Sequence, residues 1–138
     1  MNYLLDTNVL SELRKGPSRI EPSVQRWAAS QNPSRLFISA ITVFELELGT
    51  ARLRRRDELQ ARRLDTWIRE QVLDVFAGRV LPVDVAVARR AALLHVPDPR
   101  PEADALIAAT AAVNDLVIVT RNVKDFESVE VGVFNPWP

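Results

Sequence analysis

The stretch Leu116-Val117-Ile118-Val119-Thr120-Arg121-Asn122 decides the fold class of this chain. Its first four residues are apolar and three of them are β-branched, which is typical of a central strand buried on both faces of a parallel sheet. Polar residues follow this strand directly. Because ligands of open α/β sheets bind beyond the carboxyl ends of the strands, we expect chemistry at this turn.

A second junction between a strand and a polar turn opens the chain. Tyr3-Leu4-Leu5 is a short apolar run, and Asp6-Thr7-Asn8 ends it. Strands then alternate with helices to the end of the chain, which predicts one α/β domain over residues 1–138, with a mostly parallel sheet and helices on both faces. The remaining strands are predicted at residues 36–38, 79–83 and 132–134. Helices are predicted from residue 7 to 12 or 14 and at residues 21–31, 40–54, 57–77, 84–95 and 101–114.

Apolar spacing predicts which face of two long helices is buried. Ile41, Phe44 and Leu48 share a face of the helix at 40–54 and are its expected core contacts. The next helix begins at Asp57 and ends at Gly78. Its apolar stripe consists of Leu64, Trp67, Ile68, Val72, Val75 and Phe76.

The composition restricts the chemistry and the location of the protein. Lys plus Arg and Asp plus Glu both number 18, so any contact with nucleic acid rests on local basic patches. The absence of cysteine excludes disulfides, thiolate zinc sites and cysteine nucleophiles, and fits a reducing cytoplasm. His95, the only histidine, is expected at a helix end on the surface. We expect no signal peptide and no membrane span, because an acid stands at position 6 and no apolar run approaches ~20 residues.

Three carboxylates lie next to apolar segments, where burial and mutual repulsion are costly. Asp6 ends the first strand, Glu45 lies inside an apolar helix, and Asp104 begins another. A hard cation offsets both costs, and ligands that are all oxygen favour Mg²⁺ or Mn²⁺. Each acid also has a simpler interpretation, as a helix cap, as a boundary residue or as a partner of the helix dipole. Periodicity does not separate Glu45 from Glu47, although Thr42 beside Glu45 favours the former.

Four segments, in this order, resemble the motifs of PIN-domain ribonucleases, and their spacing resembles the VapC toxin branch. The ending Phe134-Asn135-Pro136-Trp137 is similar to the FitB-like subgroup. The resemblance spans nearly the whole chain and implies a PIN-like three-layer fold. The four segments are residues 4–12, 39–49, 104–111 and 120–126.

The resemblance implies a Mg²⁺-dependent endoribonuclease, the toxin of a type II toxin–antitoxin system. In PIN toxins the acids at the positions of Asp6 and Asp104 hold the metal, and the acid at the position of Glu45 completes the site directly or through water. The fourth acidic position of the family is often Asp, and Asn122 stands there in this chain. Its carbonyl oxygen can still bind a water or a metal, and Asp125 is the alternative source of charge. The number of metal ions is left open.

Substrate contacts are predicted beside this acidic site. Arg121 is the best candidate for a phosphate contact, and Thr7 and Thr120 are expected to hydrogen-bond either the acids or a phosphate. A second group of arginines is interleaved with acids, and it is interpreted either as a solvated helix face or as a contact for RNA or a partner. This group comprises Arg52, Arg54, Arg55, Arg56, Arg62, Arg63 and Arg69.

The resemblance also implies partners: a cognate antitoxin, an RNA substrate, operator DNA bound only through the antitoxin complex, and a homodimer or higher assembly. Two alternatives stay open. A PIN-like scaffold that binds without cutting is compatible with Asn122 in the acidic set. A receiver domain of the phospho-acceptor type is disfavoured, because it needs an acid pair after the first strand and an Asp after the second, where Ser39 stands.

Overall fold

A five-stranded parallel sheet forms the centre of the computed structural model, which describes residues 1–138. The strand order is β3-β2-β1-β4-β5, so β1 is the central strand and β4 is paired on both sides. The predicted interior position of β4 is therefore confirmed, although the exact centre belongs to β1. The strands are β1 (Tyr3–Leu5), β2 (Leu36–Ser39), β3 (Val80–Leu81), β4 (Val117–Val119) and β5 (Val133–Phe134).

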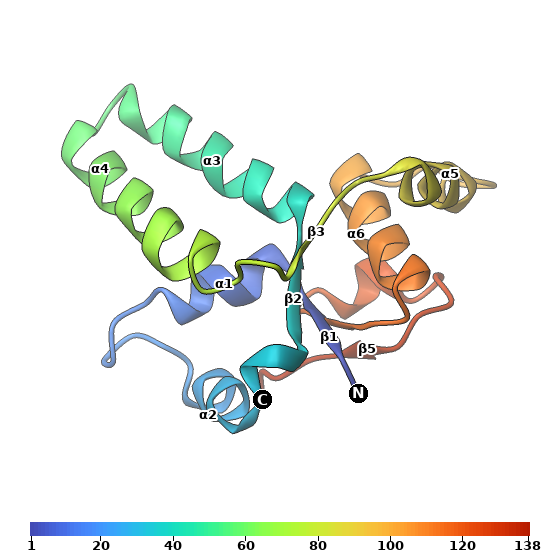
Figure 1. The fold of residues 1–138 in the computed structure, drawn as a ribbon, viewed down its shortest axis with the longest axis horizontal. Helices are drawn as coiled ribbons and strands as arrows, with labels where there is room; N and C mark the ends of the chain where they lie inside the picture. Colours follow the sequence, from blue (N-terminus) through green and yellow to red (C-terminus); the bar gives the residue numbers. More distant parts are fainter.

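Helices connect the strands and cover both faces of the sheet (Figure 1). None of them combines the length and the apolar character needed to cross a lipid bilayer. The α-helices are α1 (Thr7–Leu13), α2 (Pro22–Ser30), α3 (Ala40–Arg54), α4 (Glu58–Trp67), α5 (Val85–Leu94) and α6 (Glu102–Val113). Shorter helical turns are η1 (Pro33–Arg35), the π-helical η2 (Ile68–Leu73) and η3 (Val123–Phe126).

Alternate residues of the inner strands face two separate cores, as expected for a sheet covered on both sides. Leu5 and Val119 pack with residues of α1 and η2 on one face. Leu4 and Ile118 pack with residues of α6 and with Phe126 on the other face. The three-layer α/β fold predicted from the alternating strands and helices is thus confirmed.

The strand order excludes the receiver alternative. Flavodoxin-like folds, to which receivers belong, have the order 2-1-3-4-5, whereas this sheet has the order 3-2-1-4-5. Ser39, where a receiver needs its phospho-acceptor, is fully buried and caps α3 by accepting a hydrogen bond from the Ile41 amide.

The predicted apolar face of α3 is buried only in part. Ile41 packs against the core and Leu48 is half-buried, but Phe44 is 60% exposed. Thr42, Leu46 and Thr50 are buried instead, because most of α3 projects away from the sheet and packs against α4 (Figure 1). Thr50 is accommodated because its hydroxyl donates a hydrogen bond to the Leu46 carbonyl, 3.0 Å away.

The predicted apolar stripe of the following helix is confirmed except at Val75. Ile68, Val72 and Phe76 are buried, but Val75 is 47% exposed. The helix changes from α to π geometry at Ile68, and the wider turn shifts the later side chains around the axis. Gly78, with a φ of 81°, ends the helical segment in a conformation that side chains disfavour.

Candidate active site

The carboxyl ends of β1 and β4 lie side by side where the strand order changes direction, which is the usual ligand position in such sheets. Leu5 pairs with Val119, so the next residue of each strand, Asp6 and Thr120, meets the other at this edge. The Asp6 amide donates to the Val119 carbonyl across 2.9 Å, which extends the ladder to the site.

Asp6 is held by three donors and is only 7% exposed. The Thr120 hydroxyl donates to Oδ2 across 2.7 Å, the Thr7 amide donates to Oδ1 across 2.8 Å, and the Asn8 amide group lies 3.3 Å from Oδ2. Burial raises the pKa of Asp6, the two hydrogen bonds from Thr120 and Thr7 oppose this rise, and the charge of Asp125 adds to it. Asp6 is also the N-cap of α1, so both interpretations of this residue apply together.

Glu45, and not Glu47, faces the site. The Thr7 hydroxyl donates to Glu45 Oε1 across 2.7 Å and lies 3.2 Å from the Thr42 hydroxyl, whereas Glu47 is exposed to solvent. The hint from Thr42 in the sequence was therefore informative. Thr7 and Thr120 both hydrogen-bond the acids in this structure, which is one of the two roles predicted for them.

Asp104 approaches the same site from the first turn of α6. Its pKa is raised to about 6, chiefly by burial and then by the charges of Asp125, Asp6 and Glu45, against the opposing charge of Arg100. Four carboxylates therefore share one electrostatic environment. They remain separate, because no three acidic side chains come close enough together to hold a metal ion among them.

The fourth motif lines a pocket beside the site. Arg121, Asn122, Lys124 and Asp125 line this polar pocket with Asn135, and none of Asp6, Glu45 and Asp104 lines it. The Asn122 amide donates to the Thr120 hydroxyl across 3.0 Å, and Thr120 in turn donates to Asp6. The Arg121 guanidinium lies 5.6 Å from the centre of the Trp137 ring, so the chain end packs against the predicted phosphate contact.

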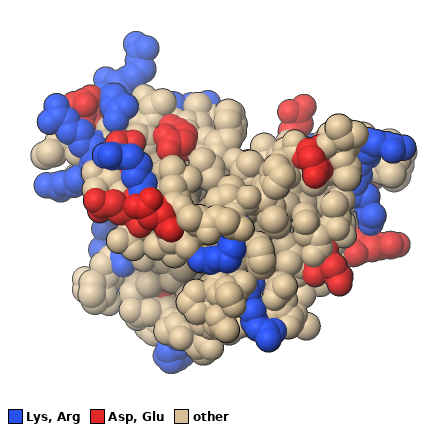
Figure 2. Space-filling view, viewed as in Figure 1, with Lys and Arg blue, Asp and Glu red and all other residues tan.

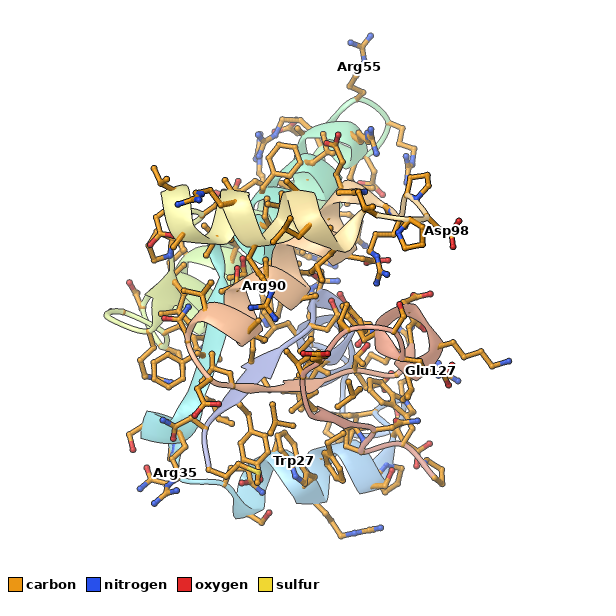
Figure 3. The ribbon with its side chains drawn as sticks, turned by 90° about the vertical axis from the view of Figure 1, so that its right-hand side faces the viewer. Trp27, Arg35, Arg55, Arg90, Asp98 and Glu127 are labelled. Carbon is orange, nitrogen blue, oxygen red and sulfur yellow. The ribbon has the colours of Figure 1, made fainter.

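The arginine-rich segment lies at the outer end of the α3–α4 hairpin, mixed with acids (Figure 2). Arg54 and Arg62 both pair with Glu58, and Arg69 pairs with Asp65. Arg55 extends from the tip of the hairpin away from the rest of the molecule (Figure 3). These pairings support the interpretation as a solvated helix face. Figure 2 also shows an indentation of the surface between this hairpin and the α5–α6 pair.

The interpretation of the sequence missed Arg100. Its side chain donates to the Leu94 carbonyl and to the Ser128 hydroxyl, at 2.9 and 2.7 Å, and its charge lowers the pKa of Asp104. The sequence did indicate this residue, because Arg100 is a cation in a proline-rich loop only four residues before Asp104. The predicted place of His95 at a helix end is confirmed, because it is the C-cap residue of α5, but it is half-buried. Trp137 packs back on the core beside the sheet.

Comparison with known proteins agrees with this geometry. The family model for the PIN domain matches residues 3–131. Toxin FitB from Neisseria gonorrhoeae is 39% identical over 97% of this chain and 97% of that protein. VapC ribonuclease Y4jK from Sinorhizobium fredii is 38% identical over 97% of this chain and 96% of that protein.

Solved structures show the same likeness. The structure of FitAB bound to an IR36 DNA fragment matches with a TM-score of 0.87 and 35% identity, over 99% of this chain and 96% of that chain. A toxin–antitoxin complex from Klebsiella pneumoniae matches with a TM-score of 0.72 and 27% identity, over 99% and 98% of the two chains. Sequence and fold agree, and the chain therefore belongs to the PIN-domain family, among the FitB and VapC toxins.

Proposed function

We propose that this protein is the toxin of a type II toxin–antitoxin system and hydrolyses RNA phosphodiester bonds with the help of a divalent metal ion. One observation carries the proposal. Asp104 lies where burial, and after it the charges of Asp125, Asp6 and Glu45 from three other segments, raise its pKa. Acids gathered at the ligand-binding edge of a sheet cost stability unless a cation or a substrate uses them.

The residues present fit Mg²⁺, with Mn²⁺ as a substitute. All the donors are oxygens, and Asp6 and Asp104 would supply two carboxylates, as Mg²⁺ sites commonly require when several waters stay bound. Glu45 would act directly or through a water, and the separation of the acids favours the water. When bound, the ion stabilises the charge that develops on the phosphate and acidifies a bound water.

The protein's own residues would orient the reaction. Thr120 and Asn8 fix the Asp6 carboxylate, and Thr7 fixes Glu45 through Oε1. Glu45 Oε2 has no hydrogen-bond partner, so it is available to accept a proton from the attacking water. The water oxygen bonds to phosphorus, one P–O ester bond breaks, and the leaving oxygen takes up a proton. No covalent intermediate with the protein is required.

Asp125 is the better source of the fourth negative charge. After burial, the charge of Asp125 contributes to the raised pKa of both Asp6 and Asp104, which supports this assignment. Asn122 contributes its backbone amide to Thr120, and its side-chain carbonyl is a candidate ligand for a water or a second metal ion. Arg121, in the same pocket as Asn122 and Asp125, is the candidate contact for the substrate phosphate.

The partners follow from the relatives. The structures that match include a toxin–antitoxin complex and a FitAB complex with DNA, so we propose a cognate antitoxin for this chain and operator DNA bound through that complex. We further propose a homodimer or a higher assembly in the cytoplasm. Phe44 and Leu59, both more than half exposed, are apolar residues that an interface would cover.

A PIN-like scaffold that binds RNA without cutting is the second candidate, because Asn122 replaces a common acid. Purified protein, free of antitoxin, is incubated with structured RNAs in Mg²⁺, in Mn²⁺ and in a chelator, and the cut ends are mapped. The nuclease predicts metal-dependent cuts that are absent with Asp104→Ala. RNA binding without any cut supports the scaffold, and equal cutting by Asp104→Ala excludes the proposed site.

A further inference from the structure

A second polar pocket lies at the end of α1 and in the turn that follows it. Ser11, Arg14, Lys15, Gly16, Arg19 and Gln60 line it, and none of these residues is apolar. Three of the six side chains are cations and none is an acid. Such a lining suits an anion with several oxygens.

This basic pocket is continuous with the acidic site. A neighbouring pocket is lined by Thr7 and Glu45 at one end and by Ser11 and Arg14 at the other, and these last two residues also line the basic pocket. A path along α1 therefore connects Glu45 with Arg14. Arg14 comes seven positions after Thr7, which corresponds to about 10 Å along the helix axis. One phosphate at the acids does not reach this far.

Two of the three cations of the pocket are not paired with an acid. Lys15 pairs with Glu12 across 2.9 Å, but neither Arg14 nor Arg19 forms an ion pair with an acid. The Arg14 guanidinium lies 5.8 Å from the centre of the Trp67 ring, which holds it against an apolar surface and keeps its donors free. Arg19 is exposed. The pocket thus presents two positive charges that no protein acid neutralises.

We propose that this basic pocket binds a backbone phosphate of the RNA substrate, one that is separate from the phosphate at the acidic site. This inference rests on the proposed ribonuclease function and adds the path of the strand: along α1, from Glu45 past Ser11 to Arg14 and Arg19. Because none of the six residues that line the pocket is apolar and three of them are cations, it binds the backbone and does not read the base sequence. An acidic segment of a protein partner is the competing occupant.

The test separates binding from cutting. A fluorescein-labelled, unstructured RNA of twelve nucleotides is titrated with metal-free protein in EDTA, and fluorescence anisotropy is recorded at several salt concentrations. Arg19→Glu reverses one charge of the pocket, and Arg14→Gln removes another. Arg89→Glu is the matched control, because it makes the same charge change on α5 and lines neither pocket. Unfolding temperatures establish that all the variants are folded.

We expect Arg19→Glu to weaken binding about tenfold at low salt and to reduce the slope of log K against log salt by about 0.7, the value for one phosphate on a single strand. Arg14→Gln should lower the affinity and the slope in the same direction, and Arg89→Glu should change neither. Equal affinity of wild type and Arg19→Glu overturns the proposal, as does an equal loss in Arg89→Glu. Unchanged RNA affinity together with weaker binding of the co-expressed antitoxin assigns the pocket to the protein partner and also overturns it.

Cleavage rates give a second test of the basic pocket, independent of the binding measurements. The ratio of kcat/KM for the twelve-nucleotide RNA to that for a dinucleotide should fall in Arg19→Glu, because only the longer RNA spans both pockets. If the wild type cuts neither RNA in Mg²⁺ or Mn²⁺, the ribonuclease proposal fails. The anisotropy comparison in EDTA still decides whether the basic pocket binds RNA.

Discussion

The Thr120 hydroxyl donates a 2.7 Å hydrogen bond to Asp6 Oδ2, and this bond joins residues that are 114 positions apart in the sequence. Thr120 is fully buried, so its hydroxyl donates to Asp6 and not to water. The same oxygen accepts hydrogen bonds from the Asn8 side chain and the Asn122 amide. The orientation of Asp6 therefore depends on the contact between the first and fourth motifs.

Replacing Thr120 with valine keeps the shape and removes this bond. Because the bond lowers the pKa of Asp6, its loss should raise that pKa further and weaken metal binding, with a loss of activity of about 10- to 100-fold. Stability should fall by about 1–2 kcal/mol. Cleavage rates, Mg²⁺ titration and urea unfolding measure these effects. Thr50→Val, another buried threonine remote from the acids, should lose stability but not metal affinity; equal metal affinities in wild type and Thr120→Val would contradict the assignment.

Asp6→Asn should abolish cleavage while the protein remains folded. Asparagine caps helices about as well as aspartate, so α1 keeps its N-cap. The substitution removes one of the two carboxylates assigned to the ion, and we expect a loss of more than about 10³-fold in kcat. Circular dichroism and the unfolding temperature check the fold, and mapped RNA ends check the activity. Full activity of this variant would refute the metal mechanism.

Asp104 makes the metal-free protein sensitive to pH. Its pKa is raised from 3.8 to about 6, so the folded state retains a proton that the unfolded chain releases. The contribution of Asp104 to the free energy of unfolding should therefore be largest below about pH 4, and it should fall as the pH rises from about 4 to 6. Above pH 6, Asp104→Asn should be more stable than wild type in EDTA by about 1–2 kcal/mol, after allowance for partial exposure. Urea unfolding at pH 4 and pH 7.5 measures the difference.

Magnesium provides the control for that experiment. Because a bound cation favours the charged carboxylate, Mg²⁺ should stabilise wild type at pH 7.5 and have little effect on Asp104→Asn. Protons compete for the same oxygens, so Mg²⁺ affinity should decline below pH 6. An equal difference in stability between wild type and Asp104→Asn at pH 4 and at pH 7.5 would show that Asp104 is not in this environment.

Glu12 shows the opposite pH dependence. Hydrogen bonds from Lys15 and from the Glu21 amide lower its pKa, so its charged form stabilises the fold above the unfolded value of 4.5. This contribution should disappear as the pH falls through the lower, folded-state pKa. Glu12→Gln should thus be less stable than wild type at pH 7 and equal to it in strong acid. Asp98 is an exposed loop residue (Figure 3), so Asp98→Asn is the control. Its stability should equal that of wild type at both pH values.

Local residue patterns were sufficient to predict the strands and the α-helices. Apolar runs such as Val117–Val119 predicted the strands, and Asp57 and Asp84 cap the helices that they were expected to begin. Asp6 and Thr120 could be placed at strand ends because a polar residue directly follows a buried run in both cases. The spacing of apolar residues was wrong for Phe44 of α3, because burial depends on which neighbour a helix meets, and Phe44 is exposed.

The sequence by itself determined the layered α/β fold and the family, and it predicted Asp6, Glu45 and Asp104 as the acids of the site, because buried runs, turn residues and motif order are local properties. Only the tertiary structure decided that Thr7 donates a hydrogen bond to Glu45 and that Thr120 donates one to Asp6. It also decided that Ser11 and Arg14 line both the pocket at Glu45 and the basic pocket. These relationships join segments up to 114 residues apart. They arise from the pairing of β1 with β4 and the packing of α1 beside α3, and no local pattern encodes the distances that such packing creates.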